Sequence, residues 1–132
     1  MERQIKFRGK TINEGEWVYG DLEYNRAKNI ARIHTYDEKG EYLMQHLVEP
    51  ESVGQFSGLL DKNDSPIYEG DIVEAYDLDE ELAFMGAVRY ALPDAAFGID
   101  KGTGASLGPF EGNMTYKVVG NFHDNIESLN GK

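Results

Sequence analysis

Polar residues of types that bind or transform ligands are concentrated in one stretch of this 132-residue chain, between positions 55 and 71. Carboxylate, amide and phenol groups that converge on one point are the usual means of holding a small polar ligand. A pair of carboxylates can also carry general acid and base chemistry. The candidate polar site predicted from this stretch consists of Gln55, Asp61, Asn63, Tyr68 and Asp71.

The same stretch also has a purely structural interpretation. Phe56, Ile67 and Ile72 are apolar residues suited to a core, and the glycines between them are suited to turns. Asp71 follows Gly70, in a place where a carboxylate can accept hydrogen bonds from the N–H groups of a turn. Because every residue type here has a packing or turn role, this interpretation is favoured and no catalytic residue is assigned.

Motifs for nucleotide and thiol chemistry are incomplete or missing. Residues 9–11 read Gly-Lys-Thr, as at the end of a phosphate-binding loop, but Gln4 stands where the first glycine of that loop belongs. The chain has no cysteine, which excludes disulfides, thiolate zinc sites and cysteine nucleophiles. We therefore expect no cofactor.

Two polar fragments imitate the start of a calcium-binding loop. The Asp-x-Asp-x-Glu fragment of residues 77–81 is followed by Leu82 where the loop needs glycine, and by Val88 where it needs glutamate. The Asp-x-Asn-x-Ser fragment of residues 61–65 fails at the same two loop positions. Neither fragment therefore predicts a metal site.

The chain is strongly acidic, with 13 Lys and Arg against 24 Asp and Glu and a formal charge of −11. A nucleic-acid-binding surface needs a basic stripe that displaces counterions from phosphates, and the basic residues here are scattered. Direct nucleic-acid binding is therefore not expected. Solvation is the favoured role of the acidic residues, and mimicry of nucleic acid is the alternative.

Length and composition fit a single globular domain over residues 1–132. No run of apolar residues approaches the ~18 that a membrane-spanning helix needs. The first residues also lack the apolar core of a signal peptide. We therefore expect a cytoplasmic protein without membrane association.

Short segments of alternating or β-branched residues between glycine-rich turns predict β-strands. In one of them, Ile30, Arg32 and His34 alternate with apolar residues and so share one face. His34, without ligands at metal-site spacing, is interpreted as a partly exposed strand residue. Residues 77–84 fit a loop or one helical turn. The predicted strands cover residues 4–8, 15–24, 29–35, 41–48, 53–60, 67–76, 85–91 and 114–122.

These strands predict an all-β fold of antiparallel sheets, including a small SH3-like barrel around residues 67–90. The barrel is suggested by a Gly-Asp-Ile-Val strand followed by Gly-Ala-Val-Arg-Tyr. Short strands leave sheet edges that need covering, so we also expect a homo-oligomer. The predicted core comprises Trp17, Phe56, Tyr68, Ile72, Val88 and Val118.

Several segments together resemble the YopX-like proteins of bacteriophages and prophages. The most specific is residues 48–59, Val-Glu-Pro-Glu-Ser-Val-Gly-Gln-Phe-Ser-Gly-Leu, which Asp-Lys-Asn follows at residues 61–63. The chain departs from the family pattern at Asp64, where glycine is usual, and over residues 77–85. The resemblance covers nearly the whole chain, and its other segments are residues 5–8, 17–21, 67–73, 86–90 and 116–122.

The resemblance implies a mainly β fold and a phage or prophage origin, and it brings no established catalytic residues. The predicted function is a phage accessory protein that acts as a non-enzymatic protein-interaction module, with a host or phage protein as its partner. Two alternatives remain open. One is a small hydrolase or nucleotide-processing enzyme with a carboxylate site, and the other is an acidic decoy of a DNA-binding host protein.

Overall fold

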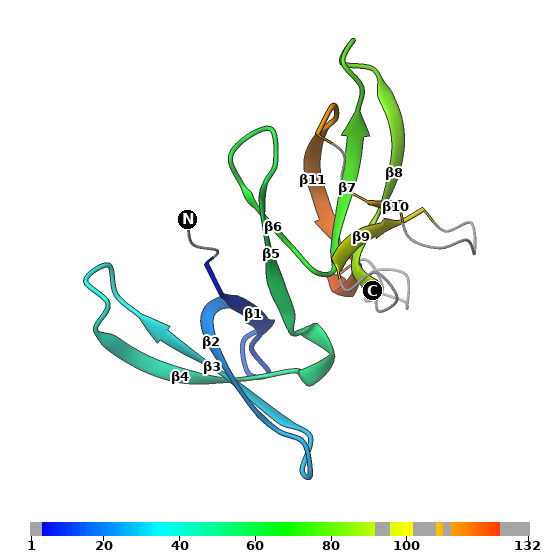
Figure 1. The fold of residues 1–132 in the computed structure, drawn as a ribbon. Coiled ribbons are helices and arrows are strands. Elements are labelled where there is room, and N and C mark those ends of the chain that lie inside the picture. Colours follow the sequence, from blue (N-terminus) through cyan, green and yellow to red (C-terminus); the bar gives the residue numbers. More distant parts are fainter. Residues whose placement is uncertain (1–3, 92–95, 102–107, 110–111, 125–132) are drawn as a thin grey trace. The chain divides into compact units, whose positions relative to one another are not determined.

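The computed structural model describes residues 4–91, 96–101, 108–109 and 112–124 (Figure 1). Within these ranges the chain forms eleven β-strands in two antiparallel sheets and very little helix, which confirms the all-β prediction. The chain divides into two compact units, Met1–Phe56 and Ser57–Lys132, which we call unit 1 and unit 2. Strand β5 (Gly54–Leu60) begins in unit 1 and continues into unit 2. The single domain expected over residues 1–132 stays a prediction.

Unit 1 is an antiparallel meander in which each strand pairs with the next along the chain. The sheet order is β4-β3-β2-β1-β5, so β4 is an edge strand. A short 3-10 helix, η1 (Pro50–Ser52), leads from β4 into β5. The four strands of the meander are β1 (Phe7–Lys10), β2 (Trp17–Asn25), β3 (Ile30–Tyr36) and β4 (Tyr42–Val48).

The core of unit 1 lies on one face of this meander. Ala31 and Ile33 alternate along β3 with outward-facing polar residues, and Val48 lies directly opposite Ala31 on β4. All three side chains are fully buried. Partly buried side chains pack against them from β1, β2 and the segment before β5: Phe7, Val18, Leu22 and Val53.

Close contacts leave no room for a side chain at two glycines in this meander. A Cβ on Gly9 would lie 2.8 Å from a Val48 methyl group. A Cβ on Gly20 would collide with the backbone carbonyl oxygen of His34 on the neighbouring strand. Only glycine therefore lets β2 and β3 lie this close together.

Unit 2 contains a five-stranded antiparallel sheet in the order β10-β9-β8-β7-β11. The short strand β6 (Pro66–Tyr68) lies outside it and belongs to the sheet of β5. The fully or nearly fully buried core of unit 2 is Ile67, Val73, Ala75, Val88, Ile99 and Tyr116. The five strands are β7 (Asp71–Tyr76), β8 (Leu82–Ala91), β9 (Ala96–Asp100), β10 (Gly108–Pro109) and β11 (Thr115–Asn121).

The SH3-like barrel predicted around residues 67–90 is not confirmed, because neither sheet closes on itself. β7 and β8 do form the expected hairpin, but β11 adds to the far side of β7 and β9 adds to the far side of β8. The hairpin is thus the centre of an open sheet. Closure depends on which strands meet at the edges, and that pairing is not encoded within residues 67–90 themselves.

Two local expectations change in the structure. Residues 77–81 form a tight hairpin loop, not a helical turn, and β8 begins at Leu82, before the predicted strand start at residue 85. Of the predicted core, Phe56, Tyr68 and Val88 are buried, as expected. The remaining three are partly buried, and Val118 among them packs against the core of unit 2: Trp17, Ile72 and Val118.

Candidate functional site

Asp61, one of the predicted polar residues, is buried and fully engaged by backbone N–H groups. Its Oδ1 accepts from the N–H groups of Asn63 at 2.8 Å and Ser65 at 2.9 Å. Its Oδ2 accepts from the Val118 N–H at 3.0 Å, which ties the β5–β6 loop to β11. A second bond between the same elements runs from the Lys62 N–H to the Tyr116 carbonyl. Asp61 therefore has a structural role as the anchor of this loop.

Two opposing effects set the pKa of the Asp61 carboxyl. Burial raises the pKa, because the charged form loses hydration. The N–H donors of Val118, Ser65 and Asn63 favour the carboxylate, and the charge of Lys117 adds to their effect. Together these contacts outweigh burial and hold the pKa of Asp61 below its ordinary value. The side chain is therefore an anion at neutral pH, already committed to the backbone.

The other predicted site residues are placed in similarly local contacts. Asp71 and Tyr68 are both buried, and the Tyr68 N–H donates to Asp71 Oδ2 at 2.8 Å. Asn63 is exposed in the β5–β6 loop. Gln55 is half-buried on β5, opposite Phe7 of β1, and belongs to unit 1. The contacts thus form two local pairs, Asp61 with Asn63 and Tyr68 with Asp71, and a shared binding role for the five residues stays a prediction.

The Asp61 loop is one of three hairpin loops with the same hydrogen bonds, at residues 37–41, 61–65 and 77–81. In each, the first aspartate accepts through Oδ1 from the N–H groups two and four residues later. The fourth residue has a positive φ: 84° at Gly40, 64° at Asp64 and 60° at Glu80. Asp64, which replaces the family's glycine, therefore adopts the left-handed conformation that glycine would favour.

This loop geometry explains the two fragments that imitate calcium-binding loops. Their leading aspartates direct Oδ1 at backbone N–H groups inside the loop, where a cation would require that oxygen to point toward the ion. Across the described residues, no three or more histidine or acidic side chains gather in a way that would hold a metal ion. The acidic fragments are therefore turn motifs.

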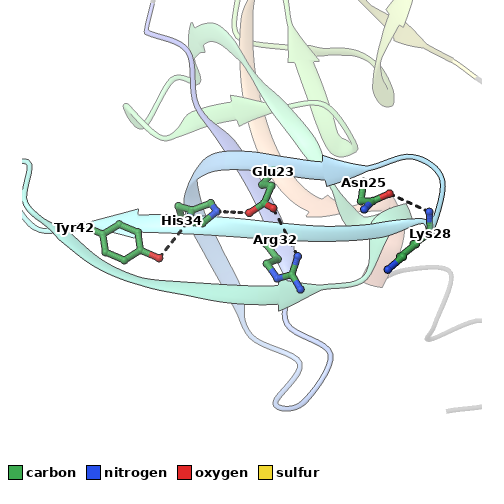
Figure 2. Close-up of polar contacts among 6 residues, drawn as sticks. All are labelled: Glu23, Asn25, Lys28, Arg32, His34 and Tyr42. Carbon is green, nitrogen blue, oxygen red and sulfur yellow. Dashed lines mark hydrogen bonds and ion pairs between the residues drawn. The ribbon is translucent and has the colours of Figure 1, made fainter.

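A different polar cluster lies in unit 1, on the face of β2, β3 and β4 turned away from the Ala31–Ile33 side (Figure 2). Register places these residues side by side, because Glu23 lies opposite Arg32 and Asp21 lies opposite His34. Tyr36 and Tyr42 face each other across β3 and β4. We call this surface the outward face, and its residues are Asp21, Glu23, Arg32, His34, Tyr36 and Tyr42.

His34 lies at the centre of the outward face and has both ring nitrogens engaged. Its Nε2 lies 2.8 Å from Glu23 Oε1 and donates to it, and its Nδ1 lies 3.1 Å from the hydroxyl of Tyr42 (Figure 2). With the proton on Nε2, the Tyr42 hydroxyl donates to Nδ1. The second carboxylate oxygen of Glu23 lies 3.8 Å from Arg32 Nη1. The imidazole is therefore held between an acid and a phenol from two neighbouring strands.

The tyrosines of the outward face are ordered by contacts as well. The rings of Tyr36 and Tyr42 pack edge to face with centroids 5.6 Å apart, and His34 packs against Tyr42 at 5.7 Å. Partial burial raises the pKa of the Tyr36 hydroxyl, and the hydrogen bond to Asp21 and the charges of Asp21 and Tyr42 raise it further. Tyr36 therefore remains a neutral hydrogen-bonding phenol at physiological pH.

The outward face combines ordered polar groups with exposed apolar area. Neighbouring side chains hold both ring nitrogens of His34. Large apolar area remains exposed beside them, with 44% of Tyr36, 52% of Tyr42 and 44% of Leu47 accessible. Ordered tyrosines with arginine alongside are typical of the centres of protein interfaces.

Sequence reasoning placed Arg32 and His34 on one face but did not find this cluster. The alternation of side chains along residues 29–35 predicted that Arg32 and His34 lie on the same face of β3. The partners Glu23 and Tyr42 come from other strands, and their identity depends on the β2–β3 and β3–β4 registers. A register argument from the 37–41 loop, which fixes the β3–β4 hairpin, was the one available signal for Tyr42.

Comparison with protein-family models identifies the family of this chain. The model of the YopX family, described as "YopX protein", matches residues 6–130. This chain belongs to the YopX family. No curated protein matches the chain significantly. The match includes the YopX-family segment that carries the Asp61 loop as well as the strands of the outward face. No helix within the described residues has the length and apolar character needed to cross a membrane.

Proposed function

We propose that this YopX-family chain is a protein-interaction module that does no chemistry of its own, and that the outward face of unit 1 is its contact surface. The observation that carries the proposal is the His34 cluster, in which one ring nitrogen is held by Glu23 and the other holds the exposed Tyr42. Side chains held in place before binding lose less entropy when a partner docks. The face therefore combines exposed apolar area with little ordering cost.

The distribution of charge supports the same choice of surface. Unit 1 contains eight Lys and Arg and ten Asp and Glu, a formal charge of −2. Unit 2 contains five and fourteen, a formal charge of −9. A nearly neutral surface pays less electrostatic repulsion when it meets an ordinary, slightly acidic protein. Unit 1 is thus the better of the two for general protein contact.

The biological setting that fits this proposal is a phage or prophage accessory protein in the bacterial cytoplasm, acting on a host or phage protein. Small accessory proteins of this kind act by binding, and a module without a catalytic centre suits that role. Self-association into a homo-oligomer is compatible with it, because a symmetric assembly would present several copies of the outward face.

A second candidate, the acidic decoy, is favoured by one observation, the concentration of charge in unit 2. Asp79, Glu80 and Glu81 are all exposed at the tip of the β7–β8 hairpin. A basic DNA-binding protein would be attracted to such a surface. In that case, binding would depend on unit 2 and would fall steeply as salt is raised.

The test compares capture of partners by the chain and by two matched variants. The chain is immobilised and exposed to lysate from bacteria that carry the gene, and each captured protein is then purified and titrated. Tyr42→Ser removes ring area from the outward face, and we expect it to weaken binding at least about tenfold. Tyr24→Ser removes an equally exposed tyrosine from the opposite face of β2 and should leave affinity unchanged.

Three results would count against the module. If Tyr42→Ser leaves the affinity for the partner unchanged, the contact surface is not the outward face. Binding abolished by Asp79→Asn with Glu81→Gln, and by high salt, would establish the decoy. Turnover of a nucleotide, peptide or glycan that Asp71→Asn abolishes, with the fold intact, would instead establish the enzyme with a carboxylate site.

A further inference from the structure

The outer edge of β4 in unit 1 is open from Tyr42 to His46. Within the described residues, no other strand pairs with the backbone there. β4 ends the sheet order, with β3 on one side only. Past His46 the edge is covered, because the Ile12 N–H donates to the Leu47 carbonyl at 3.1 Å. The Glu49 N–H likewise donates to the Lys10 carbonyl at 2.9 Å. The open part is thus about five residues long.

The direction of the free hydrogen-bonding groups follows from those contacts. In an antiparallel strand the N–H and C=O of one residue point to the same side, and successive residues alternate. Leu47 directs its carbonyl to the outer side, toward Ile12. Gln45, which lies in the regularly paired part of β4, therefore also directs its N–H and C=O groups outward. It offers one donor and one acceptor to an added strand, next to the register shift at Leu43.

β4 has no proline or charged side chain to protect this edge, and its only irregularity within the described pairing is the register shift at Leu43. Its sequence, Tyr-Leu-Met-Gln-His-Leu-Val, contains no proline, lysine or acidic residue in a chain of net charge −11. Natural edge strands commonly carry charges or proline that prevent another strand from adding. Tyr42, Leu43 and Met44 are all more than half exposed, so apolar side chains flank the edge on both sides of the sheet.

Both ends of the open edge are acidic. At one end lies the 37–41 loop, which contains Asp37, Glu38 and Glu41 and a single lysine. At the other end the chain leaves Ile12 for the turn that contains Glu14 and Glu16. An added strand with an uncharged centre and basic ends would complement this pattern.

We propose that the β4 edge binds an extended peptide segment of a partner protein as an added β-strand, with about five uncharged residues between Lys or Arg at both ends. This inference rests on the proposed function of unit 1 as a protein-interaction module and specifies its mode of binding. Backbone bonds to Gln45 supply the attachment. The acidic ends select the basic flanks.

A second copy of this chain fits the edge less well than a basic peptide. Antiparallel pairing of two β4 edges would bring the 37–41 loop of one copy toward the Glu14 and Glu16 turn of the other. Acid would then meet acid at both ends of the shared edge, which destabilises the pair. The charges therefore favour a partner of the opposite sign.

The test uses the full chain and two end-blocked synthetic peptides, Lys-Val-Thr-Val-Thr-Val-Lys and its counterpart with Glu at both ends. We expect the lysine-flanked peptide to bind about ten times more tightly at low salt, and the difference to shrink as salt is raised. Hydrogen exchange followed by NMR should show the Gln45 amide slowed about tenfold or more on binding.

A pair of substitutions at one position supplies the control. Gln45→Pro removes an outward N–H without breaking the β3–β4 ladder, since proline is tolerated where the N–H faces away from the sheet. Gln45→Thr keeps that N–H and changes only the side chain. The proline variant should lose peptide binding while the threonine variant retains it, and thermal melts of both verify folding.

The outcomes separate this inference from the proposed function. Failure of the lysine-flanked peptide to slow the Gln45 amide, or equal binding of the glutamate-flanked peptide, would overturn the inference. If sedimentation shows a dimer that dissociates in the Gln45→Pro variant, the occupant of the edge is a second copy of the chain and not a peptide. If partner capture still depends on Tyr42 while Gln45→Pro has no effect, the module stands and the edge-binding mode fails. If neither change affects capture, both proposals fail.

Discussion

The two units of this chain are built from the same kind of antiparallel hairpin, yet they use their polar side chains in opposite ways. Unit 2 buries carboxylates against backbone N–H groups, as Asp61 does with Val118 and Asp71 with Tyr68. Unit 1 pairs Glu23 with His34 on an exposed sheet face. A buried carboxylate stabilises the fold strongly, because its loss leaves several donors unsatisfied. An exposed pair contributes little stability and is free to serve recognition.

The largest effect should come from glycines, and here the two units should behave alike. Gly20→Ala in unit 1 drives a Cβ into the His34 carbonyl, and we expect a loss of about 4 kcal/mol or a failure to fold. Gly86→Ala in unit 2 places a Cβ 2.6 Å from the Asp100 carbonyl, with a slightly smaller expected loss. Chemical denaturation measures both.

Gly112→Ala is the matched control for these two substitutions, because nothing lies within 4 Å of its Cβ position. Its free energy of unfolding should stay within about 0.5 kcal/mol of the unsubstituted protein. A tolerated Gly20→Ala would show that β2 and β3 separate easily, and the register that builds the outward face would then be in doubt.

The next effect compares one loop motif in two environments. Asp61→Ala leaves the N–H groups of Val118, Asn63 and Ser65 without their acceptor at a buried site, and should lower the free energy of unfolding by about 3 kcal/mol. Asp77→Ala removes the same two loop bonds at an exposed site and should lower it by about 1 kcal/mol. Equal losses would mean that the contact with β11 adds nothing to Asp61.

A third prediction concerns pH. Because the folded-state pKa of Asp61 lies below its ordinary value of 3.8, the carboxylate contributes stability that is fully present above that value. This contribution is lost as the pH falls through the folded-state pKa. Below about pH 5, the free energy of unfolding should therefore depend less on pH in the Asp61→Asn variant than in the unsubstituted protein, as denaturation curves at several pH values would show. An Asp61→Asn curve of unchanged slope would contradict this account.

The smallest effect should be on the outward face. Glu23→Gln removes the charge that faces His34 and Arg32, and we expect the free energy of unfolding to change by less than about 0.5 kcal/mol. The NMR signals of the His34 and Tyr42 rings should nevertheless shift, because their hydrogen-bonded chain is altered. If Glu23→Gln lowered the free energy of unfolding as much as Asp61→Ala does, the exposed pair of unit 1 would be as important for stability as the buried carboxylate of unit 2.

Much of the local structure could be predicted from the sequence because it depends on neighbours along the chain. The loops at residues 37–41 and 61–65 lie between predicted strands, and their conformation is local because an aspartate side chain and a positive φ act within five residues. The loop at residues 77–81 was ambiguous, because Glu80 takes the positive φ where glycine would have signalled it. Residues 17, 72 and 118 were expected in the core and are partly buried, since alternation gives the face on which a residue lies but not how completely that face is covered.

The sequence by itself determined the class of this protein: all-β, acidic, without cysteine, and built of short strands joined by aspartate turns. Those properties follow from residue types and from spacings of a few residues. Only the tertiary structure decided that Asp61 anchors β11 across 57 positions, that the β7–β8 hairpin lies in an open sheet, and that His34 meets Glu23 and Tyr42. Each of these depends on which strands pair and in what register, and a one-residue slip would turn the same side chains to the opposite face.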